Sequence, residues 1–261
     1  MPEGDAVFRS CATLHDALAG RALTHVELRV PSAAAASQGL VGQRVVEVVP
    51  RGKHQLTRLD GGWTIHTHLR MEGTWKFVDA QGRLPGPDHE IRVLLGNDET
   101  VAVGLRLGMV DLVRTDHEDE VVGHLGPDLL GPDWDEELAV ANLLREPSRT
   151  IGEALLDQRN LAGIGTIYRA ESLFHQRINP RTPVAGVPDL LALVRTAQRL
   201  LAANKGPGPW VPTASGRDGR WVYGRAGKPC PRCRTRIQCE EYGPTTQERL
   251  VWWCPRCQPF G

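Results

Sequence analysis

The sequence predicts an α+β protein of more than one domain: a β-rich N-terminal part led by one helix, a helical part, and a small cysteine-rich module at the C-terminal end. The apolar residues change from helical spacing to short β-type runs near residue 22, and helical spacing returns near residue 136. Five of the six cysteines lie in the last 32 of the 261 residues. A chain of this length holds one large domain or two to three smaller ones.

The N-terminal part begins with a helix expected over residues 6–19, where four apolar residues recur at helical spacing. Asp5 stands where a helix N-cap belongs, and Gly20 stands where a helix stops. Seven β-rich runs follow, separated by Gly, Pro and Asp turns, and such a series predicts a sandwich or a barrel. The runs cover residues 22–30, 45–49, 54–59, 63–69, 75–78, 91–95 and 100–103.

The second half is expected to be mainly helical. The acidic stretch 114–137 contains two Gly-Pro pairs and is expected to be a linker. Segment 205–227 is rich in glycine and proline and is expected to be a loop or hinge, ahead of the cysteine-rich module 228–261. Four helices are expected between them, over residues 136–145, 151–159, 167–176 and 189–203.

Composition narrows the class of protein. The chain is 41% hydrophobic and 24% charged, so it can bury a core and is not a disordered chain. Lys plus Arg and Asp plus Glu are both 31, which argues against a protein that coats nucleic acid without specificity. Residues 205–261 hold ten basic and four acidic residues, so this end is either a solvated surface or a surface aimed at phosphates. No apolar run approaches the ~20 residues of a membrane span and no signal core is seen, so a cytoplasmic location is expected.

The four cysteines Cys230, Cys233, Cys254 and Cys257 form two CxxC pairs with 20 residues between them. Four thiolates satisfy tetrahedral zinc and leave no position for water, so the spacing predicts one structural zinc per chain. Redox-active dithiols are the alternative. Arg249 lies on the intervening segment, where a hairpin fits, and a guanidinium held there suits a phosphate or a base edge.

Weaker signals lie elsewhere along the chain. Removal of Met1 leaves Pro2 with a free secondary amine, which can form an iminium, and Glu3 stands beside it for proton transfer; an untethered terminus is the alternative. The glycine-rich turn 163–165 leads into a helix that begins near Thr166. The N-terminus of that helix suits phosphate, although many helix pairs simply turn through glycine.

Three further features lie in the β-rich part. Lys53 leads a β-run, where lysine is usually a solvated strand end. His66 and His68 share one strand face, as core histidines or as a ligand pair. Met71 stands at a loop tip between Arg70 and Glu72, where it is either a wedge between bases or a core contact.

The order of these motifs resembles one family over essentially the whole chain. Met-Pro-Glu-Gly opens the chain, Arg-Gly-Lys ends at Lys53, and His-Leu-Arg-Met-Glu-Gly follows near residue 70. Leu-Leu-Asp-Gln and Ala-Gly-Ile-Gly lie near residue 160, and the two CxxC pairs close the chain. This set is similar to the formamidopyrimidine-DNA glycosylase and endonuclease VIII family of base-excision repair enzymes, and is closest to its endonuclease VIII branch.

The resemblance implies a bifunctional DNA glycosylase and AP lyase, which removes a damaged base and then cuts the strand at the abasic site. Its implied domains are an N-terminal β-sandwich catalytic domain over 1–125, a helix–two-turn–helix DNA-binding domain over 126–212, and a zinc finger hairpin over 213–261. The implied partner is double-stranded DNA with oxidised bases or abasic sites. The implied enzyme is a monomer that associates with the nucleoid when it binds DNA.

The resemblance also implies roles for single residues. Pro2 would form the Schiff base with the sugar C1′, Glu3 would donate protons, and Lys53 would serve β-elimination. Arg249 would contact phosphate and assist δ-elimination. Met71, with Arg70, would fill the gap that the extruded base leaves.

Three positions depart from the family pattern. Ala6 stands where the family often has Glu, Thr166 where it usually has Asn, and His124 where endonuclease VIII has Arg. The DNA contacts expected here are Arg70, Met71, His124, Gly165 and Thr166. The short loop 209–221 favours oxidised pyrimidines as substrates, with oxidised purines as the alternative within the family. A zinc-ribbon DNA-binding protein with an inactive site is the alternative from another class.

Overall fold

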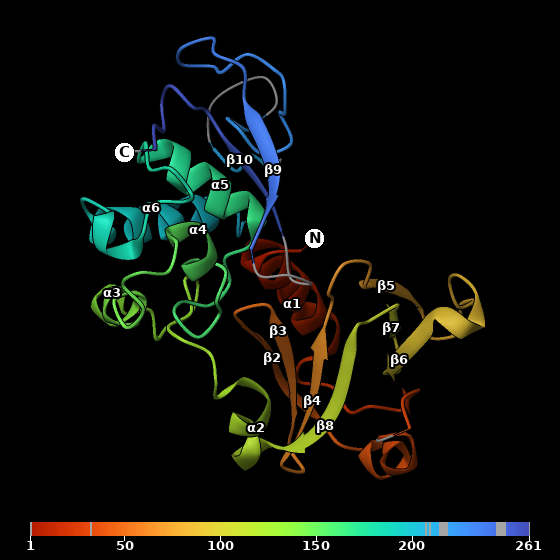
Figure 1. The fold of residues 1–261 in the computed structure, drawn as a ribbon. Coiled ribbons are helices and arrows are strands. Elements are labelled where there is room, and N and C mark those ends of the chain that lie inside the picture. The colour runs from red at the N-terminus through yellow and green to blue at the C-terminus, as the bar shows by residue number, and fades with distance from the viewer. Residues whose placement is uncertain are drawn as a thin grey trace. The chain divides into compact units, whose positions relative to one another are not determined.

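The computed structural model describes residues 2–31, 33–206, 208, 210–213, 219–243 and 249–260. The chain forms two compact units, Met1–His124 and Leu125–Gly261, and each is described by itself (Figure 1). Among the described residues, no helix is both long and apolar enough to cross a membrane.

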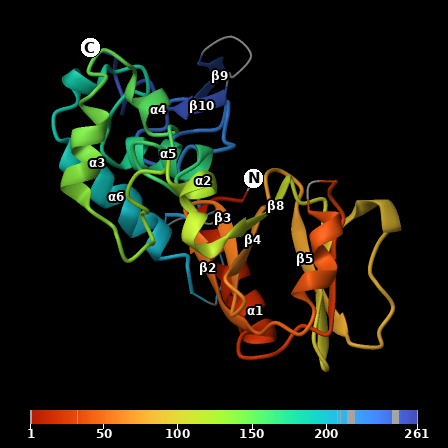
Figure 2. The same ribbon diagram turned by 90° about the horizontal axis from the view of Figure 1, so that it is seen from below.

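The first unit is a β-sandwich with a leading helix, α1 (Gly4–Leu18). Its strands are β1 (His25–Leu28), β2 (Val45–Arg51), β3 (His54–Leu59), β4 (Trp63–His68), β5 (Thr74–Asp79), β6 (Ile91–Gly96), β7 (Thr100–Leu105) and β8 (Met109–Arg114). They form two antiparallel sheets, with strand orders β1-β6-β7-β5 and β2-β3-β4-β8 (Figures 1 and 2). One buried cluster joins residues of both sheets and of α1, which confirms the predicted sandwich.

Two predictions for this unit were wrong in detail. α1 begins at Gly4 rather than residue 6, and Glu3 occupies the N-cap position expected for Asp5. Asp5 lies instead in the first helical turn, where a carboxylate favours the positive end of the helix dipole, and it pairs with Arg9 at 3.4 Å. Strand β8 was not predicted, because Met109–Arg114 runs straight into the acidic stretch. Without it the second sheet lacks an edge.

The stretch 114–137, expected to be a linker, begins with local structure that packs on the first unit. A 3₁₀ turn (Thr115–His117) and the short helix α2 (Asp119–Val122) follow β8. Glu118 accepts two hydrogen bonds from Arg58 on β3 and one from Thr64 on β4. These hydrogen bonds hold the start of the acidic stretch against the sheet. At least one of its carboxylates, Glu118, is therefore paired with an arginine and is not simply exposed to solvent.

The second unit carries α3 (Glu136–Leu143), α4 (Ile151–Ala154), α5 (Thr166–His175) and α6 (Leu190–Ala202). Helices α3 and α6 lie side by side, and the four helices share one apolar core (Figure 2). The helix predicted over 151–159 ends at Ala154, because the Asn160 amide caps the Ala154 carbonyl at 2.9 Å. Residues 155–165 therefore form a turn between two helices.

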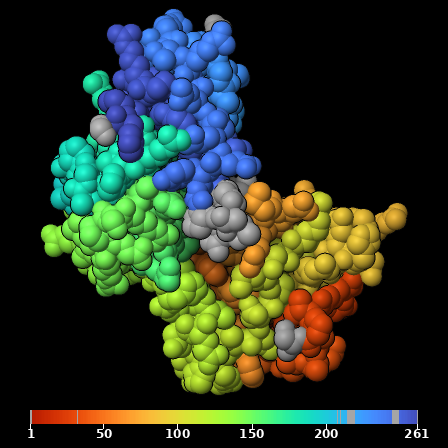
Figure 3. All heavy atoms as spheres, in the orientation of Figure 1, coloured from red at the N-terminus to blue at the C-terminus, as the bar shows by residue number. Residues whose placement is uncertain are grey.

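The cysteine-rich module packs on α5 within the second unit. Strands β9 (Gln238–Tyr242) and β10 (Arg249–Trp253) form the expected hairpin, with Arg249 opposite Tyr242. A third apolar cluster joins Phe174 of α5 to Trp252 and to the buried cysteines. The space-filling view shows this module (blue) lying directly on the helical part (Figure 3).

The carboxylate of Glu171 ties α5 to the segment that precedes the hairpin. It is fully buried and accepts hydrogen bonds from the backbone N–H groups of Trp221, Val222 and Tyr223. Helix α5 therefore helps to fix the position of the hairpin, in addition to the four cysteines.

Candidate functional site

Helix α1 runs along the β2–β3 hairpin with its N-terminus toward the hairpin turn. The backbone N–H of Val48 donates to His15 Nδ1 (3.2 Å), and Gln55, opposite Pro50, donates to Ser10 Oγ (2.9 Å). The five residues from His15 to Ser10 therefore span the same distance as the two strand residues from Val48 to Pro50, since a helix rises about 1.5 Å and a strand about 3.3 Å per residue. The seven helical residues before Ser10 add about 10 Å, which equals about three strand residues. Three residues beyond Pro50 lies the hairpin turn.

The turn places Lys53 at this same end of the first unit. Arg51 pairs with His54, and Gly52 between them has a φ of 59°, the left-handed region that glycine enters without a steric penalty. Glu3, at the start of α1, is buried, and Pro2 is half-buried. The structure thus brings Pro2, Glu3 and Lys53 to one end of the sandwich.

A cluster of imidazoles lies next to Lys53 in the first unit, and its members are His54, His66, His68 and His124. His54 Nδ1 is 2.7 Å from His66 Nε2, and His66 Nδ1 is 2.9 Å from the Asp111 carboxylate. The His54 ring also meets His68 edge-on, with ring centres 4.8 Å apart, and His124 at 6.1 Å. The sequence left open whether His66 and His68 were core residues or metal ligands, and the structure makes them members of this cluster, with His66 fully buried and His68 half-buried.

Burial keeps the imidazoles of His54, His66 and His68 neutral. Desolvation lowers the pKa of His54 to about 3 and the pKa of His68 to about 4, and the neighbouring imidazoles and Lys53 act in the same direction. Desolvation also lowers the pKa of His66, although Asp111 opposes that shift. At neutral pH His54, His66 and His68 are therefore hydrogen-bonding groups rather than cations.

This burial predicts acid sensitivity of the first unit. Because the pKa values fall on folding, the unfolded chain binds more protons, so the stability is complete above pH ~6.5 and is lost as the pH falls toward 4. Each such histidine contributes a slope of up to about 1.4 kcal/mol per pH unit. Urea unfolding between pH 7.5 and 5 measures it. His54→Asn should flatten the slope, whereas the control His117→Asn, at an exposed site, should not; equal slopes would contradict the prediction.

The loop after β4 presents an exposed methionine. The backbone N–H of Arg70 donates to His68 Nδ1 at 2.8 Å, and Arg70 itself has a φ of 51°. Met71 is 65% exposed, so the core contact considered for it is wrong. An apolar side chain held outside the core beside an arginine is available to a partner.

In the second unit, residues 155–165 form a braced turn. Gln158 accepts from the Gly163 N–H at 3.0 Å and donates to the carbonyls of Leu156 and Ile164. Gly163 has a φ of 100°, which favours glycine, and Gly165 is the N-cap of α5. Thr166 is the first residue of α5, so the predicted turn and helix start lie where the sequence put them.

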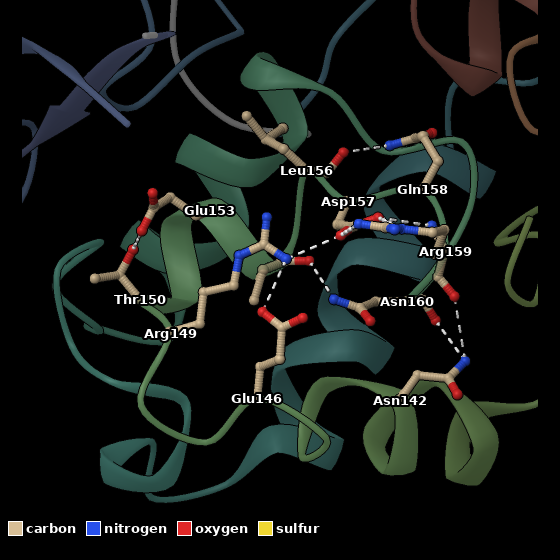
Figure 4. Close-up of polar contacts among 11 residues, drawn as sticks. Asn142, Glu146, Arg149, Thr150, Glu153, Leu156, Asp157, Gln158, Arg159 and Asn160 are labelled. Atoms are coloured by element: carbon tan, nitrogen blue, oxygen red, sulfur yellow. Dashed lines mark hydrogen bonds and ion pairs between the residues drawn. The ribbon is translucent and has the colours of Figure 1, made fainter. Parts of the chain in front are cut away.

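A cavity of about 330 Å³ lies between this turn and the zinc-finger-like hairpin. Arg249 lines it from β10, and Arg149, Arg159 and Arg169 line it from the helical part. Asp157 accepts hydrogen bonds from Arg149 (2.9 Å) and Arg159 (2.8 Å), which hold the pKa of its carboxyl well below the usual range (Figure 4). The cavity therefore carries more positive than negative charge and suits an anion.

The sequence did not single out the groups that shape this cavity. Arg169 is buried and donates to the Leu250 carbonyl of β10 at 2.6 Å, which joins α5 to the hairpin that bears Arg249. Arg149 and Asp157 are separated by eight residues and meet only because α4 ends at Ala154. No local sequence pattern predicts these contacts between residues that are distant along the chain or separated by a turn.

The four cysteines converge on one point. Their sulfur atoms all lie within 4.8 Å of one another, with Cys230–Cys257 at 3.8 Å and Cys233–Cys254 at 3.4 Å. A disulfide would need about 2.05 Å, whereas the edge of a tetrahedron with Zn–S bonds of about 2.3 Å is close to the first of these distances. The donor set fits a four-coordinate metal with no open position, and it argues against separate redox dithiols.

Comparisons with known proteins cover the whole chain. Residues 1–125 match the model of the formamidopyrimidine-DNA glycosylase N-terminal domain, and residues 125–203 match that of the H2TH domain of the same enzymes. The chain is 50% identical to a probable endonuclease 8 2 of Streptomyces coelicolor, over 99% of this chain and 94% of that one. It is 42% identical to a DNA-(apurinic or apyrimidinic site) lyase, Nei2, of Mycolicibacterium smegmatis, over 99% of both.

Solved structures show the same fold at lower identity. The formamidopyrimidine-DNA glycosylase of Lactococcus lactis, solved with DNA that contains an AP site, superposes with a TM-score of 0.84 and 22% identity, over 99% of this chain and 100% of that one.

Proposed function

This chain belongs to the formamidopyrimidine-DNA glycosylase and endonuclease VIII family, and from that membership we propose the residues and the substrate of its reaction. Its activity is that of a DNA glycosylase with DNA-(apurinic or apyrimidinic site) lyase activity in base-excision repair. In this proposal its substrate is duplex DNA. The enzyme works in the cytoplasm, at the nucleoid when it is bound to DNA, and it acts as a monomer.

The placement of the α1 N-terminus at the Lys53 turn carries the proposal. Once Met1 is removed, the Pro2 amine attacks the sugar C1′, displaces the base and loses its proton. The C1′–O4′ bond of the sugar ring then opens, and the nitrogen lone pair forms the iminium. Glu3, buried beside it, protonates the groups that depart. Lys53, a cation on the turn at the same end of the sandwich, serves the elimination that follows by stabilising the phosphate that leaves.

The second unit holds the DNA backbone in this proposal. Arg249 meets a phosphate at the arginine-lined cavity and assists δ-elimination. Gly165 and Thr166 offer backbone N–H groups at the start of α5 to a phosphate, and His124 and Arg70 add contacts from the first unit. Thr166 reaches less far than asparagine would.

Zinc is the metal proposed for the four cysteines. Thiolate ligands at these separations fit zinc, and the absence of a fifth donor among the described residues makes the site structural. Cys230, Cys233, Cys254 and Cys257 would hold the ion, which contributes no step to the reaction.

Oxidised pyrimidines are the favoured lesions. The relatives with 42–50% identity carry endonuclease 8 or Nei2 names, which supports this branch. Oxidised purines remain the alternative, because other relatives are formamidopyrimidine-DNA glycosylases with 34–35% identity. Residues 209 and 214–218 of the loop 209–221, on which the sequence-based preference also rests, lie outside the described residues.

Borohydride trapping tests this function. Untagged protein is incubated with duplexes that carry thymine glycol, 8-oxoguanine or an abasic site. We expect covalent complexes with the abasic site and thymine glycol, and mass spectrometry should place the adduct on the peptide that begins at Pro2. An adduct on another peptide would refute the mechanism, and DNA binding without any adduct would favour an inactive DNA-binding protein.

Met71→Ala should separate base removal from strand cleavage. Met71 is 65% exposed, so its truncation should cost little stability. We expect about a tenfold loss in the removal of thymine glycol from duplex, since extruding a base costs a few kcal/mol and the side chain fills the gap. Cleavage of a preformed abasic site should stay within about twofold. Val46→Ala, at another exposed apolar position, is the matched control, and equal losses in both reactions would count against the wedge.

A further inference from the structure

The imidazole cluster contains a hydrogen-bond chain with a fixed direction. The Asp111 carboxylate accepts, so His66 Nδ1 carries the hydrogen of the 2.9 Å bond. A neutral His66 then has a lone pair on Nε2, which accepts from His54 Nδ1 at 2.7 Å. This assignment leaves the lone pair of His54 on Nε2, as in other sites where a carboxylate sets the tautomer of a histidine.

The free end of this chain reaches solvent beside Lys53. Among the described residues, His54 Nε2 has no hydrogen-bond partner, and it is absent from the fully buried unpartnered atoms there. His66, by contrast, is fully buried. The hydrogen-bond chain therefore runs from the half-exposed Asp111 carboxylate, through the buried His66 ring, to the accessible Nε2 of His54.

Burial keeps that nitrogen unprotonated until it is used, because it lowers the pKa of His54. The rings of His66, His68 and His124 and the charge of Lys53 act in the same direction. Arg70 acts on His68, and Asp111 and Glu118 act on His66. Phosphates of bound DNA would oppose the positive groups, so the basicity of His54 rises when substrate is present.

We propose that His54 is the proton acceptor of the strand-cleavage step, with His66 and Asp111 as the residues that orient it. This inference rests on the proposed Schiff base at Pro2. An iminium at C1′ acidifies the C2′ hydrogen, and an oriented neutral imidazole is the group that general base catalysis uses near neutral pH. Lys53 remains the cation that meets the leaving phosphate.

The step balances without any further reactant. The C2′ proton passes to His54 Nε2, and the C–H electron pair forms the C1′=C2′ bond of an enamine while the iminium nitrogen becomes neutral. The enamine then expels the 3′ phosphate, whose oxygen keeps the electron pair of the broken C3′–O bond. A C2′=C3′ bond and the iminium result, and the His54 proton is released to phosphate or water. Asp111, through His66, stabilises the transient imidazolium.

Two substitutions at His54 separate catalysis from packing. His54→Asn keeps an amide N–H near the position of Nδ1, so it can still donate to His66, but it offers no basic nitrogen. We expect cleavage of a preformed abasic site to fall roughly a hundredfold or more in kcat, with KM within about twofold. Borohydride trapping should persist or increase, because the Schiff base still forms and accumulates.

Chemical rescue gives the second readout. His54→Gly leaves room for added imidazole, which should restore strand cleavage in a concentration-dependent way, and His117→Gly is the matched control. Asp111→Asn should lower kcat with trapping retained, because an amide no longer selects one tautomer of His66.

The outcomes are distinct. If His54→Asn cuts at the wild-type rate, or if imidazole gives no rescue and trapping falls together with cleavage, His54 has only a packing role and this inference is overturned. If the wild-type protein itself neither traps nor cuts, the proposed function fails first, and this inference fails with it.

Discussion

A single residue left ahead of Pro2 should abolish covalent trapping. An extra residue converts the secondary amine into an amide, and an amide nitrogen cannot attack C1′ or form an iminium. We expect trapping and strand cleavage to fall below detection, a loss of several orders of magnitude, when a glycine from a cleaved tag precedes Pro2. DNA affinity should stay within a fewfold, since the arginine-lined cavity and the start of α5 lie in the other unit.

Two comparisons make this result specific to the amine. Pro2→Gly keeps a free amine, now primary, and should retain partial trapping. Glu3→Gln keeps the amine but loses the buried carboxyl, so base removal should fall more than cleavage of a preformed abasic site. If the protein with the extra glycine is trapped at the wild-type level, another residue must be the nucleophile, and the assignment of Pro2 is overturned.

The prediction from sequence succeeded where chemistry is encoded locally. The two CxxC pairs meet because each pair needs only a tight turn and the spacing allows a hairpin, and the sulfur atoms do converge. The turn through Gly163 and Gly165 could be predicted for the same reason, since a φ of 100° at Gly163 favours glycine. Local backbone requirements leave a mark on the sequence.

The prediction failed where a site is assembled by pairing across the sheet. His66 and Asp111 are 45 residues apart and meet because β4 and β8 are neighbours in register. Strand β8 was not predicted, so no acidic partner for His66 was evident from the sequence. His54 was passed over because its neighbour Lys53 carried the family motif. The direction of the hydrogen-bond chain depends on three strands and no motif describes it.

Helix ends show the same limit on a smaller scale. Apolar spacing continues past Ala154, which is why a helix over 151–159 was expected. The Asn160 side chain caps the Ala154 carbonyl, and the Asn142 amide binds the carbonyls of Arg159 and Asn160 (Figure 4). These side chains satisfy backbone groups that a longer helix would have used itself, so the chain turns and Asp157 reaches Arg149.

Cys254→Ser should have the largest effect on the second unit. Cys254 is fully buried, and it packs with Cys230, Phe174 and Trp252 in the cluster that joins the hairpin to α5. Loss of one thiolate from four opens the site, and structural zinc sites of this kind contribute about 10–16 kcal/mol of apparent binding free energy. We expect the variant to lose its zinc and to change its tryptophan fluorescence. We also expect DNA binding to fall by at least tenfold, because Arg249 lies on the hairpin that the metal holds.

Cys239→Ser is the matched control for that experiment. Cys239 lies on the same hairpin, paired with Trp252, but stands outside the four-sulfur cluster. It should keep one zinc per chain, with DNA binding and cleavage near the wild-type level. Metal analysis of both variants decides the question. A Cys254→Ser protein that still binds one zinc and cuts abasic-site DNA normally would show that the metal does not organise the hairpin, and the role given to Arg249 would then need another support.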